Sequence, residues 1–265
     1  MSVIWTKRFY SMGSVQLSCK GSSLKECDII TQDGKSGIVM RIHENEGGYS
    51  VYGYDLKGIA SFRKMTEETI SAGTSVEETL RGWVTTYLLT GDRTIEGLSL
   101  ASKIGVDVTF DEEITITEGT TLSDALETYC TKFEIGWDIT FDKGALTFSF
   151  ISPRENKDVV FSRKNKTLEN PEHIIDAYDE VNNSGTGIFR REGEVNEPAK
   201  DYVTGTATPK AVGYLLGDKV SVQEFGITGE LQITEIQYVY EPNNIITVPS
   251  FGEVKQNIIK RLLKR

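Results

Sequence analysis

Polar and apolar residues alternate in short stretches along most of this chain. The first four stretches are VIWTKRF, SVQLSCK, GIVMRIH and YSVYGYD, and β-branched residues are frequent in them. A period of two is typical of half-buried strands, because successive side chains of a strand point to opposite faces. The loop ENEGG lies between the third and fourth stretches, and its glycines can adopt the positive φ of a hairpin turn. We therefore expect the chain to begin with a four-stranded antiparallel meander.

Two stretches with helical spacing interrupt the strands. Ser75 and Glu78 form a capping box at the start of a helix expected at residues 75–90. A second helix is expected at residues 121–133, followed by a hairpin that turns at residues 142–144. The last third returns to strands, which we expect at DVVFS, YVTGTAT, GDKVSVQ, ELQITEIQYVY and NIITV.

Charge and composition exclude several classes of protein. The 265 residues carry a net charge of −10, which argues against a protein that holds nucleic acid through its phosphates. The start, MSVIWTKRFY, has charges where a signal peptide needs an apolar run, and no later stretch approaches the roughly 18 apolar residues of a membrane span. We therefore expect no membrane anchor. Cys19, Cys27 and Cys130 lack metal-ligand spacing and are expected to be reduced and buried.

A few local patterns resemble sites of chemistry. The acids DEE at residues 111–113 could divide acid and base roles, but neighbouring strand residues point to opposite faces, and we expect a solvated turn. His43 and His173 have no metal ligand at a suitable spacing, although a nucleophile pair of Cys130 and His173 stays a minor alternative. The GTG at residues 185–187 is too short for a phosphate loop. We expect no catalytic residue, no metal ligand and no cofactor.

The segment YGYDLKGIASFRK, residues 52–64, follows the fourth strand and is interpreted as scaffolding at the exit from the first sheet. Its two glycines are expected to permit bends, and Asp55 is expected to cap a turn. The expected apolar anchors are Leu56, Ile59 and Phe62. Gly217 and Asp218 are expected to form a comparable turn before a later strand.

Several stretches, taken in order, resemble a known family. They are IWTKRFYSMGSVQLSC, DIITQDGKSGIVMRIHENEGGYSVYGYDLKGI, DVVFSRKNKTLENPEHIIDAYDEVNNSGTG, YLLGDKVSVQ, LQITEIQYVYE and VPSFGEV. Together they are similar to the tail-tip hub proteins of long-tailed bacteriophages over nearly the whole chain. The resemblance also favours an extended NPEHIIDAY, although Asn170 and Pro171 are helix start signals.

The resemblance implies an α+β, mainly β fold, that of the phage baseplate hub, with two small tube-like antiparallel β-barrel domains and inserted α/β segments. Residues 1–64 would form part of the first barrel, and residues 65–157 an inserted α/β region with two helices and a hairpin. Residues 158–250 would complete the first barrel and form the second. Residues 251–265 would be a basic docking segment.

The implied function is structural, at the tip of the virion tail, after assembly in the cytoplasm of the host bacterium. A homotrimer would close the tail tube below the ring of the distal tail protein and form the channel for DNA ejection. Other implied partners are the tape measure protein and tail fibre or receptor-binding components. One alternative is a hub or ring component of another contractile or phage-derived injection particle. A cell-wall hydrolase is a weaker alternative, since it would need two carboxylates about 5 to 10 Å apart in a cleft; we expect no enzyme.

Two further expectations concern the C-terminus and the charge. Residues 254–265 have apolar residues at helical spacing and basic residues near the end, which predicts a docking helix; a frayed tail and a basic amphipathic membrane anchor are the alternatives. An acidic lumen would keep DNA phosphates from binding to the channel wall, whereas the alternative is that the charge only keeps the ring soluble. The candidate lumen residues are Asp28, Asp33, Glu44, Glu46, Asp218, Glu224, Glu230 and Glu235.

Overall fold

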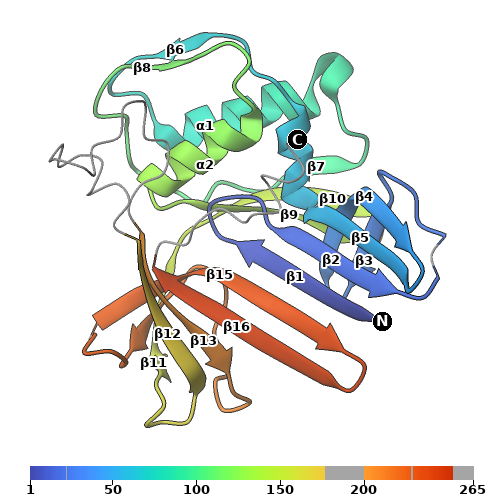
Figure 1. The fold of residues 1–265 in the computed structure, drawn as a ribbon. Coiled ribbons are helices and arrows are strands. Elements are labelled where there is room, and N and C mark those ends of the chain that lie inside the picture. The colour runs from blue at the N-terminus through green and yellow to red at the C-terminus, as the bar shows by residue number, and fades with distance from the viewer. Residues whose placement is uncertain (22, 177–199, 228, 253–265) are drawn as a thin grey trace, which may run out of the picture. The chain divides into compact units, whose positions relative to one another are not determined.

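The computed structural model of the chain describes all residues except 22, 177–199, 228 and 253–265. It divides into two compact units (Figure 1). Unit 1 consists of Met1–Arg154 and Gln237–Ile245, and unit 2 of Glu155–Ile236 and Ile246–Arg265.

Unit 1 begins with a sheet of antiparallel strands. They are β1 (Ser2–Arg8), β2 (Ser14–Cys19), β3 (Ile29–Gln32), β4 (Lys35–Asn45) and β5 (Gly48–Asp55). The order is β1-β2-β5-β4-β3, with β15 (Gly229–Glu241) on the other side of β1. The expected meander is therefore wrong. The chain crosses from β2 to β3 through a loop too long for a tight hairpin, and the β4–β5 hairpin then brings β5 back beside β2.

The unit 1 sheet is curled, because side chains join edge strand β3 and the start of β4 to β1 and β15, which lie several strands away in the sheet. Lys35 Nζ, beside edge strand β3, donates to the Tyr240 hydroxyl of β15 at 2.8 Å and lies 4.0 Å from the centre of the Tyr238 ring. The Trp5 indole N–H donates to the Gln32 side chain at 3.2 Å. The small core inside the curve contains Val3, Trp5, Val15 and Tyr240, with Leu17, Ile30 and Tyr238 packed against it.

An insertion of helices and short strands follows β5. Its elements are η1 (Leu56–Phe62), β6 (Glu68–Ile70), α1 (Val76–Val84), η2 (Thr85–Leu89), η3 (Gly91–Arg93), β7 (Leu98–Leu100), β8 (Ile114–Ile116), α2 (Leu122–Lys132), β9 (Gly136–Asp142) and β10 (Ala145–Ile151). Both predicted helices form. Ser75 Oγ accepts from Glu78 N at the expected cap, and Thr121 Oγ1, for which no cap is predicted, accepts from Asp124 N. The predicted hairpin pairs β9 with β10, β7 joins β10 in parallel, and β6 pairs with β8.

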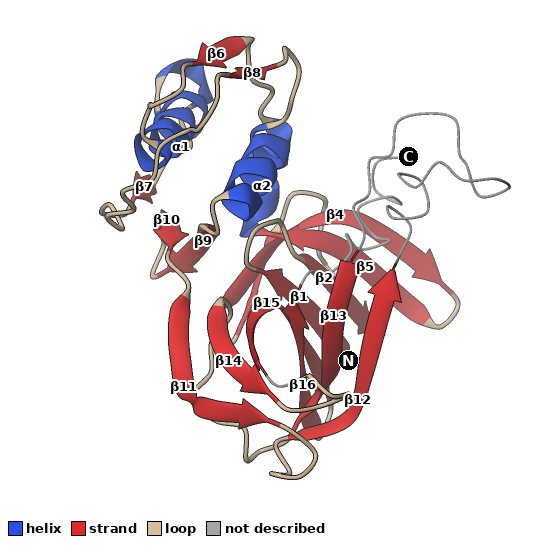
Figure 2. Ribbon diagram, turned by 90° about the vertical axis from the view of Figure 1, so that its left-hand side faces the viewer, coloured by secondary structure: helices blue, strands red, loops and turns tan. Residues whose placement is uncertain are grey.

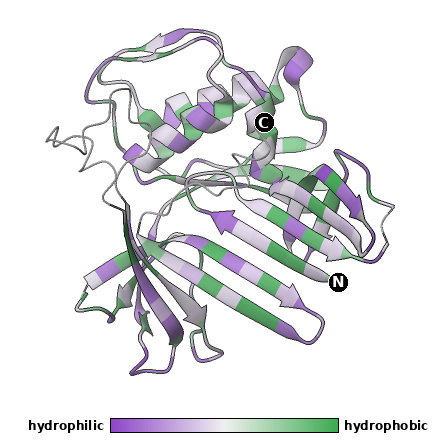
Figure 3. Ribbon diagram, viewed as in Figure 1, coloured by the Kyte–Doolittle hydropathy of each residue, from purple (hydrophilic) through white to green (hydrophobic). Residues whose placement is uncertain are grey.

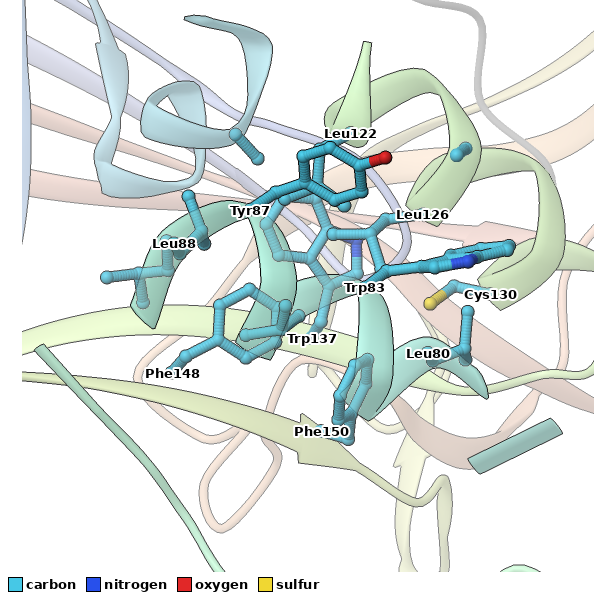
Figure 4. Packing of buried hydrophobic residues seen from close by; sticks show 14 of the residues in the cluster. Leu80, Trp83, Tyr87, Leu88, Leu122, Leu126, Cys130, Trp137, Phe148 and Phe150 are labelled. Atoms are coloured by element: carbon cyan, nitrogen blue, oxygen red, sulfur yellow. The ribbon is translucent and has the colours of Figure 1, made fainter. Parts of the chain in front are cut away.

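The main core of unit 1 lies between α1, α2 and the β9–β10 hairpin (Figure 4). The Trp137 and Phe148 rings are stacked with centres 5.5 Å apart, and Leu80, Trp83 and Tyr87 belong to the same cluster. Fully burying one such side chain stabilises the fold by about 1.5–3 kcal/mol, so this cluster contributes strongly to the stability of the unit. Within the described residues, every helix is too short or too polar to cross a membrane.

Unit 2 is a second curled sheet. It contains β11 (Arg154–Phe161), β12 (Leu168–Asp176), β13 (Lys200–Ala207), β14 (Asp218–Val222), the first part of β15 and most of β16 (Asn244–Gly252), in the order β11-β14-β15-β16-β13-β12. Figure 2 shows these strands curving around a common interior, and in Figure 3 apolar and polar residues alternate along them. Phe161 of β11 packs against Phe251 of β16, with their ring centres 4.7 Å apart, although two strands lie between β11 and β16 in the sheet.

The expected α+β, mainly β class is confirmed, but neither sheet is a closed barrel. In the described part of unit 2, the end strands β11 and β12 do not pair with each other. The strand expected at NPEHIIDAY is confirmed as far as Asp176, with a bulge near Asn170, whose φ is 46°. The domain boundaries at residues 64, 157 and 250 stay a prediction.

Candidate functional site

The exit from the first sheet carries two fully buried charged side chains, Asp55 and Lys57. Asp55 is at the N-cap position of η1 but makes no capping hydrogen bond, so the expected cap is wrong. Its Oδ2 lies 3.3 Å from Lys7 Nζ, and the same Nζ is 2.7 Å from Asp138 Oδ1 of β9. Burial acts to lower the pKa of Lys7, but the carboxylates of Asp55 and Asp138 more than offset this and raise it. The carboxylate of Asp55 therefore serves an ion pair rather than a helix end.

Lys57 binds the connection between β1 and β2. Its Nζ donates to the carbonyl oxygens of Arg8 at 2.5 Å, Ser11 at 3.1 Å and Phe9 at 3.2 Å. It also lies 4.8 Å from the centre of the Trp137 ring. Burial lowers the pKa of Lys57 to about 8, although Asp138 and Asp55 act in the opposite direction.

Trp137 of β9 completes this ionic junction, by which we mean Lys7, Asp55, Lys57, Asp138 and Trp137. Its indole N–H donates to Tyr10 O at 2.6 Å, and its backbone N–H donates to Phe9 O at 3.2 Å. The junction thus fixes the β1–β2 connection against η1 and β9. This geometry supports the interpretation of residues 52–64 as scaffolding. The sequence gives one sign that Lys57 belongs to this junction: it is the single charged residue in the run LKGIASF.

Two details of the exit segment differ from expectation. Leu56 is buried, but Phe62 is 47% exposed and is no anchor. The buried residues of η1 are Leu56, Lys57, Gly58 and Ala60. The expected anchor Ile59 is partly buried and packs against the main core of unit 1. Gly53 permits close packing rather than a bend: a Cβ there would lie 2.1 Å from a carbonyl oxygen of the neighbouring strand.

The patterns that resembled sites of chemistry are accounted for by local structure. The acids at residues 111–113 are exposed, and Lys132 Nζ lies 3.0 Å from Asp111 and lowers its pKa through a hydrogen bond. Cys130 is fully buried, and burial raises the pKa of its thiol, which disfavours a thiolate nucleophile. His173 pairs with Asp201 at 2.6 Å.

The expectation of three buried thiols is correct only for Cys130, since Cys19 is half-buried and Cys27 is exposed. Cys19 is the last residue of β2, and Cys27 lies in the loop before edge strand β3. Among the described residues, no three His, Cys, Asp or Glu side chains gather to hold a metal ion. The GTG at residues 185–187 and the segment 254–265 lie outside the described residues.

Two of the candidate lumen acids are buried and have structural partners. Asp218 Oδ2 accepts hydrogen bonds from Leu215 N and Asn156 Nδ2, at 2.9 and 2.8 Å. Glu224 accepts from the backbone N–H and the Nε of Arg163. Neither carboxylate is a candidate for a channel wall, because each is buried and accepts hydrogen bonds from neighbouring residues. Asp33, Glu44, Glu46 and Glu230 are exposed, and Asp28 and Glu235 are half-buried.

Comparisons with known proteins were informative only for structure. No protein-family model matches the sequence, and no curated protein matches it significantly. The tail protein from Neisseria meningitidis MC58 matches with a TM-score of 0.57 and 14% identity, over 95% of this chain and 91% of that one. Prophage tail protein gp18 from Listeria monocytogenes EGD-e matches with a TM-score of 0.57 and 12% identity, over 98% and 90% of the two chains.

A third match comes from a secretion system. The E. coli c3393 protein, a component of the type VI secretion system, is described as structurally similar to the T4 bacteriophage tail proteins gp27 and gp5. It matches with a TM-score of 0.51 and 8% identity, over 97% of this chain and 74% of that one. The likeness inferred from the sequence is therefore confirmed at the level of the fold: over nearly its whole length, this chain has the fold of phage tail proteins.

Proposed function

We propose that the chain is a structural phage tail protein, the baseplate hub at the tail tip, and that it catalyses no reaction. The observation that carries this proposal is the extent of the structural match, which includes both curled sheets and the insertion. A likeness confined to one sheet would not distinguish a tail protein from other β proteins. Because the match includes both units, it favours a role in which the whole chain serves as a tail protein.

The open edges of the two sheets favour assembly into a ring. Among the described strands, β3 in unit 1 and β11 and β12 in unit 2 each pair on one side only. Unpaired strand edges are open to association with another chain. In the proposed ring, each curled sheet acts as one tube-like barrel, so three copies supply six barrels. Residues 1–64 then form part of the first barrel, and residues 65–157 form the insertion. Residues 158–250 complete the first barrel and form the second, and residues 251–265 dock on a neighbour.

The proposed ring sits below the distal tail protein, contacts the tape measure protein and the fibre or receptor-binding components, and surrounds the DNA during ejection. The exposed acids Asp33, Glu44, Glu46 and Glu230 are the lumen candidates. Carboxylates on the channel wall would repel DNA phosphates over a Debye length of about 8–10 Å. Replacing these four acids by lysine should slow ejection at low salt, and added salt should restore it. Unchanged ejection kinetics would contradict the acidic lumen without affecting the hub proposal.

Imaging of tails that carry an affinity-tagged copy of the chain tests the hub proposal. Three copies at the tail tip are expected, and light scattering should show that the free chain associates at high concentration. Absence of the tag from tails, or its position along the tube, would contradict the hub role. A stable monomer together with six copies per tail would contradict the trimer.

A second candidate function is a hub or ring component of an injection particle that carries no DNA. The match to the type VI secretion component favours it. Purified particles separate the two candidates, since only a phage tail is joined to a capsid that contains DNA.

A further inference from the structure

A groove of about 570 Å³ opens in the insertion between β6 and α1. Every residue of 66–71 lines one wall, whereas the helical wall is formed by Thr79, Gly82, Trp83 and Thr86. Successive side chains of a strand point to opposite faces, so a wall formed by all consecutive residues presents the edge of the strand. The helical residues recur at i, i+3, i+4 and i+7 and therefore lie on one face. The groove thus lies between a strand edge and a helix face.

The backbone next to β6 shows which edge faces the helix. Met65 uses both its N–H and its C=O in hydrogen bonds with the loop before α2, on the β8 side. The N–H of Thr66 points the other way and donates to the Tyr87 hydroxyl at 3.0 Å. Alternate residues of an extended strand direct their backbone groups to opposite edges. Glu68 and Ile70 therefore present N–H and C=O groups to the groove, and in the described chain β6 pairs with no strand except β8.

Gly82, in the helical wall, lowers the stability of α1. It lies inside α1 with ordinary helical φ, and a Cβ built on it would meet no atom within 4 Å. Glycine inside a helix costs about 1 kcal/mol relative to alanine. Neither the backbone conformation nor the packing of this chain requires that cost. What the glycine provides is an open helix surface in the helical wall of the groove.

The walls of the groove are rigid. Trp83 and Tyr87 belong to the main core of unit 1 (Figure 4). The Trp83 indole N–H donates to Glu68 Oε2 at 2.9 Å, which links the helix to the strand, and both residues line the groove. The groove is therefore formed before any ligand enters, which lowers the entropic cost of binding.

We propose that this groove binds an extended segment of another tail protein, which adds to β6 as a third strand and lies over Gly82. Only an extended polypeptide presents backbone groups at the spacing of Glu68 and Ile70. The lining contains the carboxylates of Glu67 and Glu68 and no basic side chain of the described chain, so the segment carries a basic residue beside Glu67. A small residue faces Gly82. The inference rests on the proposed function, which supplies the second tail protein.

Hydrogen–deuterium exchange on the full-length protein, free and in assembled tails, tests the pairing. The peptide covering residues 66–71 is expected to exchange at least about tenfold more slowly in tails, because amides of a paired strand are protected. Equal exchange in free and assembled protein would overturn the inference while leaving the hub proposal intact. Absence of the wild-type chain from tails would overturn both.

Substitution of Gly82 provides the matched test. The Cβ of Gly82→Leu meets no atom of this chain within 4 Å, and leucine is a better helix former than glycine, so the thermal midpoint is expected at or above that of the wild type. Thr128→Leu, at an exposed position of α2, is the control. We expect Gly82→Leu to abolish the protection of residues 66–71 or the incorporation into tails, and Thr128→Leu to change neither. Full protection in the Gly82→Leu variant would overturn the inference.

Discussion

Replacing Lys57 by methionine removes a buried ammonium group while keeping a side chain of similar length. The ammonium donates to the carbonyl oxygens of Arg8, Phe9 and Ser11. The Phe9 carbonyl keeps a second donor, the backbone N–H of Trp137 at 3.2 Å. Hydrogen bonds to a charged group contribute about 1.5–3 kcal/mol each, so losing the other two costs about 3–6 kcal/mol. The variant no longer has to desolvate a charge, which offsets part of this loss, and we expect a net destabilisation of about 2–4 kcal/mol.

Urea unfolding followed by tryptophan fluorescence measures this change in unit 1, because Trp5, Trp83 and Trp137 all belong to that unit. The corresponding decrease in Tm is about 5–15 °C for a unit of this size. Lys64→Met is the control, since Lys64 is exposed and its replacement should change stability by less than about 0.5 kcal/mol. A Lys57→Met variant as stable as the wild type would show that the buried ammonium costs as much as its hydrogen bonds contribute.

Three further predictions concern pH, glycine packing and catalysis. The pKa of Lys57 is lowered from 10.5 to about 8 in the folded chain, so between pH 8 and 10.5 the unfolded chain binds more protons than the folded chain. Urea titrations in this pH range should therefore show that the stability of the wild type rises with pH relative to that of Lys57→Met. Above pH 10.5 the raised pKa of Lys7 makes stability fall with pH in the wild type and in Lys57→Met alike, since the folded chain then holds the extra proton. Thermal unfolding should show Gly53→Ala to be destabilised by about 1–3 kcal/mol through overpacking, and Gly82→Ala to be stabilised by about 1 kcal/mol. Purified peptidoglycan incubated with the protein should release no soluble fragments; release that is lost in Asp111→Ala would contradict a purely structural role.

The local elements of this protein follow from its sequence because their causes are local. The caps at Ser75 and Thr121 lie within three residues of the N–H groups that they accept. The β9–β10 turn needs positive φ at two adjacent positions, and Lys143 and Gly144 adopt it, at 48° and 88°. Alternation of polar and apolar residues is likewise sufficient to predict most strands, since it depends only on the pleat.

Tertiary structure alone decided the strand order and which charged groups are buried. The pairing of β2 with β5 joins residues far apart in the sequence, and the alternation of β2 would suit either neighbour. Charged residues usually lie at the protein surface. Lys57, Asp218 and Glu224 are nevertheless buried, because distant segments supply their hydrogen-bond partners. A sequence pattern records the polarity of a side chain, whereas its burial depends on the groups that the fold brings to it.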